Sequence, residues 1–126
     1  MKYLFRLMVV SGTLIPTLLS AQSAPTGTWI STAQTPDGPV TFKVVISDAG
    51  TYTVDVGNDN SVETNGKYEV SGDQMTIQDV DGPGACTAGK GVYTFKVEGN
   101  TLTMNRVSDA CEGRAGPEGK MVFTKQ

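Results

Sequence analysis

The sequence predicts an all-β protein, a small eight-stranded antiparallel up-and-down barrel with one disulfide. The first observation behind this prediction is an internal repeat: residues 66–77 lead to Cys86, and residues 91–104 lead to Cys111. Each copy reads Gly-x-Tyr, a strand, a Gly-Asp or Gly-Asn turn, an alternating strand and a cysteine. The second observation is that the runs after the first two dozen residues alternate with a period of two and show no helical pattern. Consecutive β-hairpins therefore account for the chain.

Alternating runs bounded by Gly, Asn, Asp and Pro predict the strands in order. They cover residues 28–31, 40–47, 51–56, 62–70, 74–80, 92–98, 101–107 and 120–125. The prediction of the first strand depends on Trp29 alone, whereas each of the other predicted strands has an apolar face. In chain order these faces are Phe42, Val44 and Ile46; Tyr52, Val54 and Val56; Tyr68 and Val70; Met75 and Ile77; Tyr93, Phe95 and Val97; Leu102 and Met104; Met121 and Phe123. One apolar and one polar face per strand indicate antiparallel sheet around a single core.

Three turns agree with the phase of these faces: 48–50, Gly72-Asp73 and Gly99-Asn100. They all fall at one end of the predicted barrel. The longer connections, 32–39, 57–61, 81–91 and 108–119, fall at the other end, which we call the long-loop end. Residues 32–39 contain two prolines, so we expect this connection to form a lid of fixed shape over the barrel.

The N-terminus is typical of a secretory signal peptide, which we assign to residues 1–23. Lys2 and Arg6 precede an apolar stretch over 7–19, and small residues follow it. A retained N-terminal anchor helix is the alternative interpretation. Residues 24–126 then form one domain, exported to the periplasm or the extracellular space.

Cys86 and Cys111 are the two cysteines of the chain. In an exported protein they predict a disulfide, and two buried free thiols are the alternative. The strands at 92–98 and 101–107 form a hairpin between them, so both cysteines belong to the long-loop end.

The charge pattern excludes some classes of partner. Without the signal peptide the chain keeps 8 basic residues against 13 acidic ones, and the basic residues form no cluster. We therefore expect no nucleic-acid partner and no membrane span after the signal peptide.

The residue types do not favour catalysis. The chain has no histidine, which removes the commonest general base and the commonest zinc ligand. No nucleophile elbow or phosphate loop is present, and the spacing of Asp79, Asp81 and Asp109 matches no calcium loop. We expect a protein that is not an enzyme and has no cofactor and no metal site.

The inward phase predicts one pair of charges. Continuing the inward faces of 74–80 and 101–107 leads to Asp79 and Arg106, which are equivalent positions of the two repeats at the long-loop end. They form either a polar anchor for a ligand or a structural pair, unless a bulge turns them outward. Asp109 is expected to pair with Arg106 or with Arg114, bracing the disulfide loop.

Tyr52, Tyr68 and Tyr93 also point inward by phase. A buried tyrosine usually packs its ring in the core and sends its hydroxyl to an acceptor at the rim. The alternative is that the three rings line a cavity and orient a ligand. Because many aromatic side chains face inward from short strands, we expect a largely filled barrel.

Three features resemble the lipocalin-like, or calycin, small β-barrels of exported bacterial proteins. They are the opening Gly27-Thr28-Trp29, the Gly-x-Tyr cadence of the repeats, and the Asp-x-Cys-x-x-Arg pattern from Asp109 to Arg114. The resemblance covers residues 24–126. It implies that a basic residue from near the last strand covers Trp29. Lys125 is the best match for that residue. We expect Trp29 to plug the base of the barrel, and a contact with a ligand is the alternative.

The resemblance implies a non-enzymatic barrel that binds a small apolar or amphipathic molecule at the long-loop end. The candidate ligand-binding residues are Asp79, Arg106, Tyr52, Tyr68 and Tyr93. One alternative is an interaction module with a filled barrel, like small exported protease inhibitors, which binds a protein through its loops. The other alternative is a purely structural domain.

Overall fold

The computed structural model describes residue 12 and residues 23–126 of the chain. The predicted signal peptide, residues 1–23, lies outside the described residues apart from positions 12 and 23. Within the described residues, no helix is long and apolar enough to cross a membrane.

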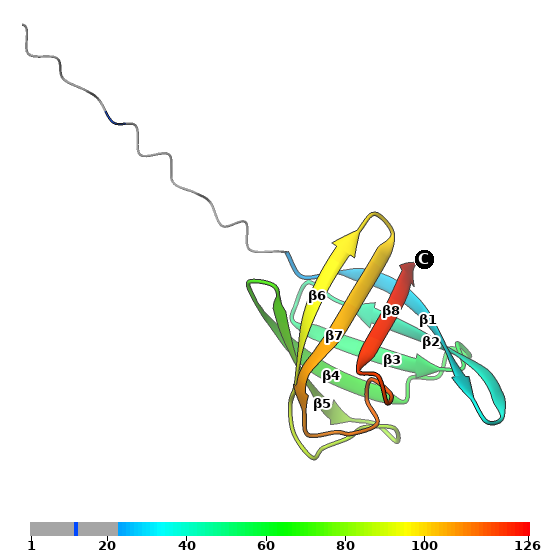
Figure 1. Cartoon of the computed structure of the whole chain (residues 1–126). Coiled ribbons are helices and arrows are strands. Elements are labelled where there is room, and N and C mark those ends of the chain that lie inside the picture. Colours follow the sequence, from blue (N-terminus) through cyan, green and yellow to red (C-terminus); the bar gives the residue numbers. More distant parts are fainter. Residues whose placement is uncertain (1–11, 13–22) are drawn as a thin grey trace, which may run out of the picture.

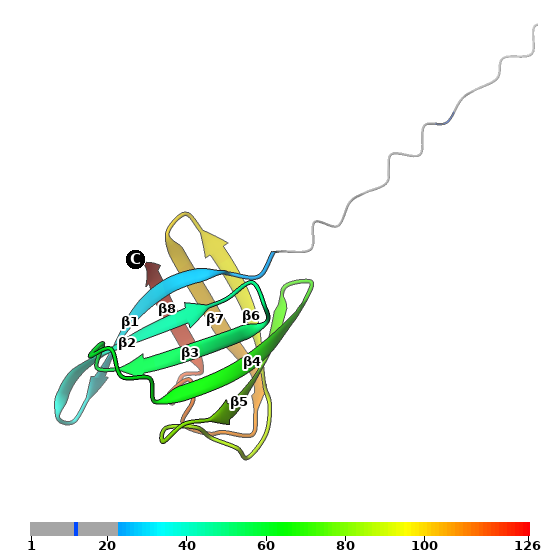
Figure 2. The ribbon, with the colours of Figure 1, turned by 180° about the vertical axis from the view of Figure 1, so that it is seen from behind.

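Antiparallel strands follow one another in sequence order around a closed barrel (Figure 1; Figure 2 gives the view from behind). Their bounds are β1 Gly27–Thr35, β2 Gly38–Ile46, β3 Thr51–Val56, β4 Thr64–Ser71, β5 Gln74–Asp81, β6 Gly91–Glu98, β7 Thr101–Asp109 and β8 Lys120–Lys125. A disulfide joins Cys86 to Cys111. The predicted fold class is confirmed, and the disulfide indicates an oxidising compartment.

The lid predicted over residues 32–39 is wrong. β1 and β2 continue through these residues as one hairpin, in which Thr35 pairs with Gly38 across a turn of two residues. Pro39 is tolerated in β2 because β2 pairs with β3 only from Phe42 onward, so the missing N–H breaks no bond between these strands. Figure 1 shows this hairpin, in cyan, reaching past the ends of its neighbours.

Outside this hairpin, two strand boundaries differ from the prediction by two residues, and others by one. β4 begins at Thr64, so Val62 is left exposed in the preceding loop, and β7 continues to Asp109. The extension of β7 includes a β-bulge. Tyr93 pairs with Arg106 and Val92 with Ser108, which leaves Val107 without a partner.

β5 has the equivalent irregularity. Gly66 pairs with Asp79 and Asn65 with Asp81, so Val80 has no partner. Val80 and Val107 are 53% and 55% exposed. The internal repeat thus extends to its bulges, which come directly after Asp79 in one copy and directly after Arg106 in the other.

The core fills the barrel unevenly. Its most deeply buried side chains are Trp29, Met75, Tyr93 and Leu102. Tyr52 and Tyr68 also face inward, as predicted. Val56 and Val97 were expected in the core but are 37% and 41% exposed. They occupy inward positions near strand ends, where the barrel is open to water.

The barrel closes weakly between β8 and β1. These strands share only two residue pairs, Trp29 with Lys125 and Ile30 with Thr124. By contrast, β6 and β7 share eight pairs. Beyond Ile30, the Ser31 hydroxyl donates to the Val122 carbonyl at 2.8 Å, and β1 then separates from β8. We call this place the β1–β8 seam.

Candidate functional site

A cavity of about 1140 Å³ occupies the barrel interior and reaches the long-loop end. Its apolar wall includes Phe42, Val44, Val54, Met104, Met121 and Phe123. Ser31 to Gln34 of β1 and Met121 to Phe123 of β8 also line it, so it borders the β1–β8 seam. The loop of residues 111–118 forms the rest of its rim.

The expectation of a largely filled barrel is therefore wrong. Trp29, Tyr93 and Phe95 belong to the packed core and do not line the cavity. In the middle of β2 and β3 the wall is formed by the valines Val44 and Val54. Their short side chains do not reach across the barrel, and this leaves the space.

A buried polar network borders the cavity at the long-loop end. It consists of Tyr52, Asp79, Arg114, Asp109 and Tyr93, and we call it the Arg114 network. The Tyr52 hydroxyl donates to Asp79 Oδ1 at 2.6 Å, and the Tyr93 hydroxyl donates to Asp109 Oδ2. Arg114 lies between the two acids, with Nη1 2.9 Å from Asp109 Oδ1 and Nη2 3.5 Å from Asp79 Oδ2.

The two cysteines extend the Arg114 network into the loops. The Cys86 amide donates to Asp79 Oδ2 at 2.9 Å, and the Cys111 amide donates to Asp109 Oδ1 at 2.8 Å. The aspartate near the end of each repeat strand thus holds the loop that carries the next cysteine. The disulfide and the Arg114 network therefore support each other.

The glycines of the two Gly-x-Tyr motifs make room for the Arg114 network. A Cβ atom at Gly66 would overlap the ring of Tyr52, which crosses Gly66 to reach Asp79. A Cβ atom at Gly91 would collide with Asp109, Arg114 and Tyr93. Neither glycine has a φ angle in the left-handed region, which other residues avoid. Glycine is needed at these positions because the neighbouring side chains leave no room for a Cβ atom.

The tyrosines of the Arg114 network are held in their neutral form. Burial raises the pKa of Tyr52, and its hydrogen bond to Asp79 raises it further. The pKa of Tyr93 is raised in the same way, by burial and then by Asp109. Arg114 opposes both shifts but does not cancel them.

The predicted pair of Asp79 with Arg106 does not form. Arg106 is exposed on the rim, where its Nη1 lies 3.4 Å from the Gly116 carbonyl. Its backbone amide donates to Gly119 at 2.7 Å, so the bulged end of β7 is tied to the loop before β8. The guanidinium beside Asp79 belongs to Arg114 instead, and the predicted brace of Asp109 by Arg114 is confirmed.

The candidate ligand-binding residues are placed unequally. Asp79 and Tyr52 line the cavity, whereas Arg106, Tyr68 and Tyr93 do not. Tyr68 lies toward the tight-turn end, where its hydroxyl donates to the Ser47 carbonyl. From the sequence, Arg114 was predicted only to brace the disulfide loop. The Asp-x-Cys-x-x-Arg pattern is the sequence feature that pointed to this arginine.

Trp29 closes the base of the barrel, as predicted. It is 1% exposed, and its indole nitrogen donates to the Pro25 carbonyl at 2.9 Å. Trp29 pairs with Lys125 across the two strands, and Lys125 Nζ lies 5.7 Å from the ring centroid. This is the position expected for the covering basic residue.

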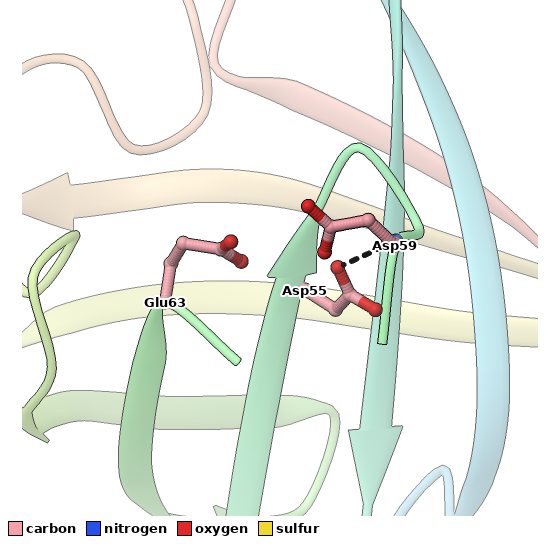
Figure 3. Close-up of side chains that lie close together, drawn as sticks. All are labelled: Asp55, Asp59 and Glu63. Atoms are coloured by element: carbon pink, nitrogen blue, oxygen red, sulfur yellow. Dashed lines mark hydrogen bonds between the residues drawn. The ribbon is translucent and has the colours of Figure 1, made fainter. Parts of the chain in front are cut away.

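Three carboxylates gather outside the cavity, at the end of β3: Asp55, Asp59 and Glu63 (Figure 3). Asp55 is 2% exposed although the alternation placed it on the polar face. Burial by itself would raise its pKa. The amides of Asp59 and Asn60, the side chain of Asp59 and the charge of Lys43 together outweigh this effect and leave the pKa of Asp55 below its ordinary value.

Each of these carboxylates already accepts a backbone hydrogen bond. Asp55 accepts from Asp59 and Asn60, Asp59 from Ser61, and Glu63 from Val56. Lys43 Nζ lies 3.8 Å from Asp55 Oδ2 and supplies a positive charge. The cluster is therefore explained as the frame of the loop between β3 and β4.

Comparison with known proteins leaves the barrel without a family. No protein-family model, curated protein or solved structure matches this chain. The geometry of the cavity and of the Arg114 network is therefore the basis for assigning a function.

Proposed function

We propose that this chain is an exported, non-enzymatic, lipocalin-like barrel that binds a small apolar or amphipathic molecule in its cavity. The observation that supports the proposal is the cavity itself. Its volume of about 1140 Å³ is slightly larger than the range of small-molecule sites, about 300 to 1,000 Å³, so a small molecule has room in it. Its walls are mainly apolar, with polar groups gathered at one end, as in sites that bind an oriented ligand.

We expect a ligand to enter the cavity through the β1–β8 seam. Strands β1 and β8 are joined by two residue pairs, and both border the cavity beyond them. A ligand that enters there meets Phe42, Val44 and Met121 first. The Arg114 network lies at the long-loop end and stabilises the conformation of the rim. The cavity favours this carrier over an interaction module, which needs a filled barrel.

The test is binding of the neutral apolar dye Nile red to the oxidised protein, followed by its fluorescence. Val44 lines the cavity, whereas the adjacent Val45 is exposed on the outside of the same strand. We expect Val44→Trp to weaken dye binding by about tenfold or more, because the indole fills space that the dye needs. Val45→Trp is the matched control and should bind like the unchanged protein.

Two results would contradict the proposal. Equal dye affinity of the two tryptophan variants would show that the dye does not occupy the cavity. Absence of dye binding by the unchanged protein, with a bare mass in native mass spectrometry, would reject the carrier function. Circular dichroism and a thermal melt check that Val44→Trp is folded. If it is not, Val54→Leu with Thr53→Leu as its control replaces this pair.

A further inference from the structure

We infer that the cavity selects amphiphiles by the charge of the head group: a cationic head group is bound most tightly, an uncharged one less tightly, and an anionic one most weakly. This inference rests on the proposed function and names the class of ligand. It follows from the charged side chains that border the cavity, which are Asp79, Glu112, Glu118, Arg114 and Lys120.

The positive charge of Arg114 is not available to a ligand. Its guanidinium contacts two carboxylates, at 2.9 Å from Asp109 and 3.5 Å from Asp79. Nη2 also faces the carbonyl oxygens of Cys86 and Gly89, both at 3.5 Å. One cation thus stands between two anions, and a third anion placed beside them would be repelled by Asp79.

The remaining donor of Arg114 does not change this conclusion. Its Nε is buried and has no hydrogen-bond partner among the described residues. The atom is covered from solvent, and the whole side chain is 11% exposed. A head group in the cavity therefore reaches this nitrogen no better than water does.

The rim side chains that line the cavity are two acids and one base. Arg106, also on the rim, lies against Gly116 and Gly119 and does not line the cavity. Glu112 and Glu118 come from the loop between β7 and β8, and Lys120 begins β8. All three are exposed. A trimethylammonium head group at this rim gains from the two glutamates. Among these lining side chains, a sulfate or carboxylate gains only from Lys120 and is opposed by both glutamates, so it loses water without full compensation.

The apolar wall of the cavity binds the alkyl tail of the amphiphile. An alkyl chain fits beside the flexible side chains of Met104 and Met121, which adapt to irregular apolar shapes. Tail burial is common to all amphiphiles of equal length. The difference between them is therefore set by the head group.

The test compares three amphiphiles with one tail: decyltrimethylammonium, decanol and decyl sulfate. Each displaces Nile red from the oxidised protein at concentrations below micelle formation, in low salt. We expect decyltrimethylammonium to bind most tightly, decanol next, and decyl sulfate about tenfold more weakly than decyltrimethylammonium. Salt should reduce this difference, because the rim charges are exposed.

A matched pair of variants locates the effect. Glu112→Gln combined with Glu118→Gln should reduce the ratio of the two charged ligands' affinities several-fold. Glu69→Gln removes an exposed charge from β4, away from the cavity, and should leave the ratio unchanged. Decyl sulfate binding as tightly as decyltrimethylammonium would overturn the head-group inference while leaving the carrier function intact. Failure of all three amphiphiles, and of Nile red itself, would instead overturn the proposed function.

Discussion

At the scale of single residues, the buried polar groups have specific partners. Tyr52 and Tyr93 each bury a ring and donate a hydroxyl to a carboxylate at the long-loop end. Their rings belong to the core, and their oxygens belong to the Arg114 network. This agrees with the usual behaviour of buried tyrosines, and it ties the core to the loops.

The raised pKa values of these tyrosines predict a loss of stability at high pH. The unfolded chain releases the phenol protons near the ordinary pKa of 10.0, but the folded chain retains them at higher pH. The stability that the raised pKa values of the tyrosines contribute to the folded state is thus complete below pH 10. It is lost as pH rises from there through the folded pKa values. Each such tyrosine should lower the free energy of unfolding by about 1.4 kcal/mol per pH unit in that window.

Absorbance at the phenolate band, followed together with circular dichroism during alkaline titration, measures this effect. We expect phenolate to form together with unfolding. The variant with Tyr52→Phe and Tyr93→Phe should lose stability less steeply above pH 10. If phenolate formed near pH 10 while the circular dichroism stayed native, the tyrosines would not be protected as the structure indicates.

At the scale of the elements, two kinds of bond hold the loop at the end of each repeat. The first is the disulfide between the loops after β5 and β7. The second is the hydrogen bond from the cysteine amide of each loop to Asp79 or Asp109. Strand ends that would otherwise fray are thereby held in the geometry that Arg114 requires.

Replacing both cysteines by serine should lower the free energy of unfolding by about 3.5 kcal/mol. The disulfide spans a sequence separation of 25 residues, and a loop of this length has that closure entropy in the unfolded chain. Urea denaturation measures the change. Reduction of the unchanged protein should reproduce it. A loss below about 1 kcal/mol would mean that the Arg114 network alone orders the loops.

At the scale of the whole molecule, the barrel is strong on one side and weak on the other. β6 and β7 share eight residue pairs around a filled part of the interior. β8 and β1 share two, beside the cavity. A closed barrel lacks free edges in principle, but among the described residues β1 has no strand pairing on its β8 side beyond Ile30, and the Ser31 hydroxyl makes the last hydrogen bond to β8.

Hydrogen exchange should detect this asymmetry. Thr35 and Gly38 flank the turn as a bonded pair, so alternation directs the backbone groups of Thr32 and Gln34 away from β2, toward the seam. We expect the amides of Thr32 and Gln34 to exchange rapidly, and those in the middle of β6 and β7 to exchange slowly. Exchange measured by NMR tests this. Equal protection at both places would show that the seam is closed in solution.

Much of the fold could be predicted from the sequence because alternation and turn chemistry are local. The phase of each strand placed Tyr52, Tyr68 and Tyr93 inside. Turn residues such as Gly72 and Gly99 set the hairpins, and the order of the hairpins placed both cysteines at the long-loop end. The position of Lys125 over Trp29 followed from the meeting of the first and last strands.

The tertiary structure alone decided which arginine meets Asp79, how far β1 and β2 extend, and whether the barrel is filled. The bulge after Arg106 changes the pairing along β7, and the link between Cys86 and Cys111 holds the loop that carries Arg114 beside both acids. The cavity depends on how far the side chains of β2 and β3 reach toward those of β7 and β8. Alternation states which way a side chain points. Only the packed barrel determines what it meets there, because that depends on register and volume across strands distant in the sequence.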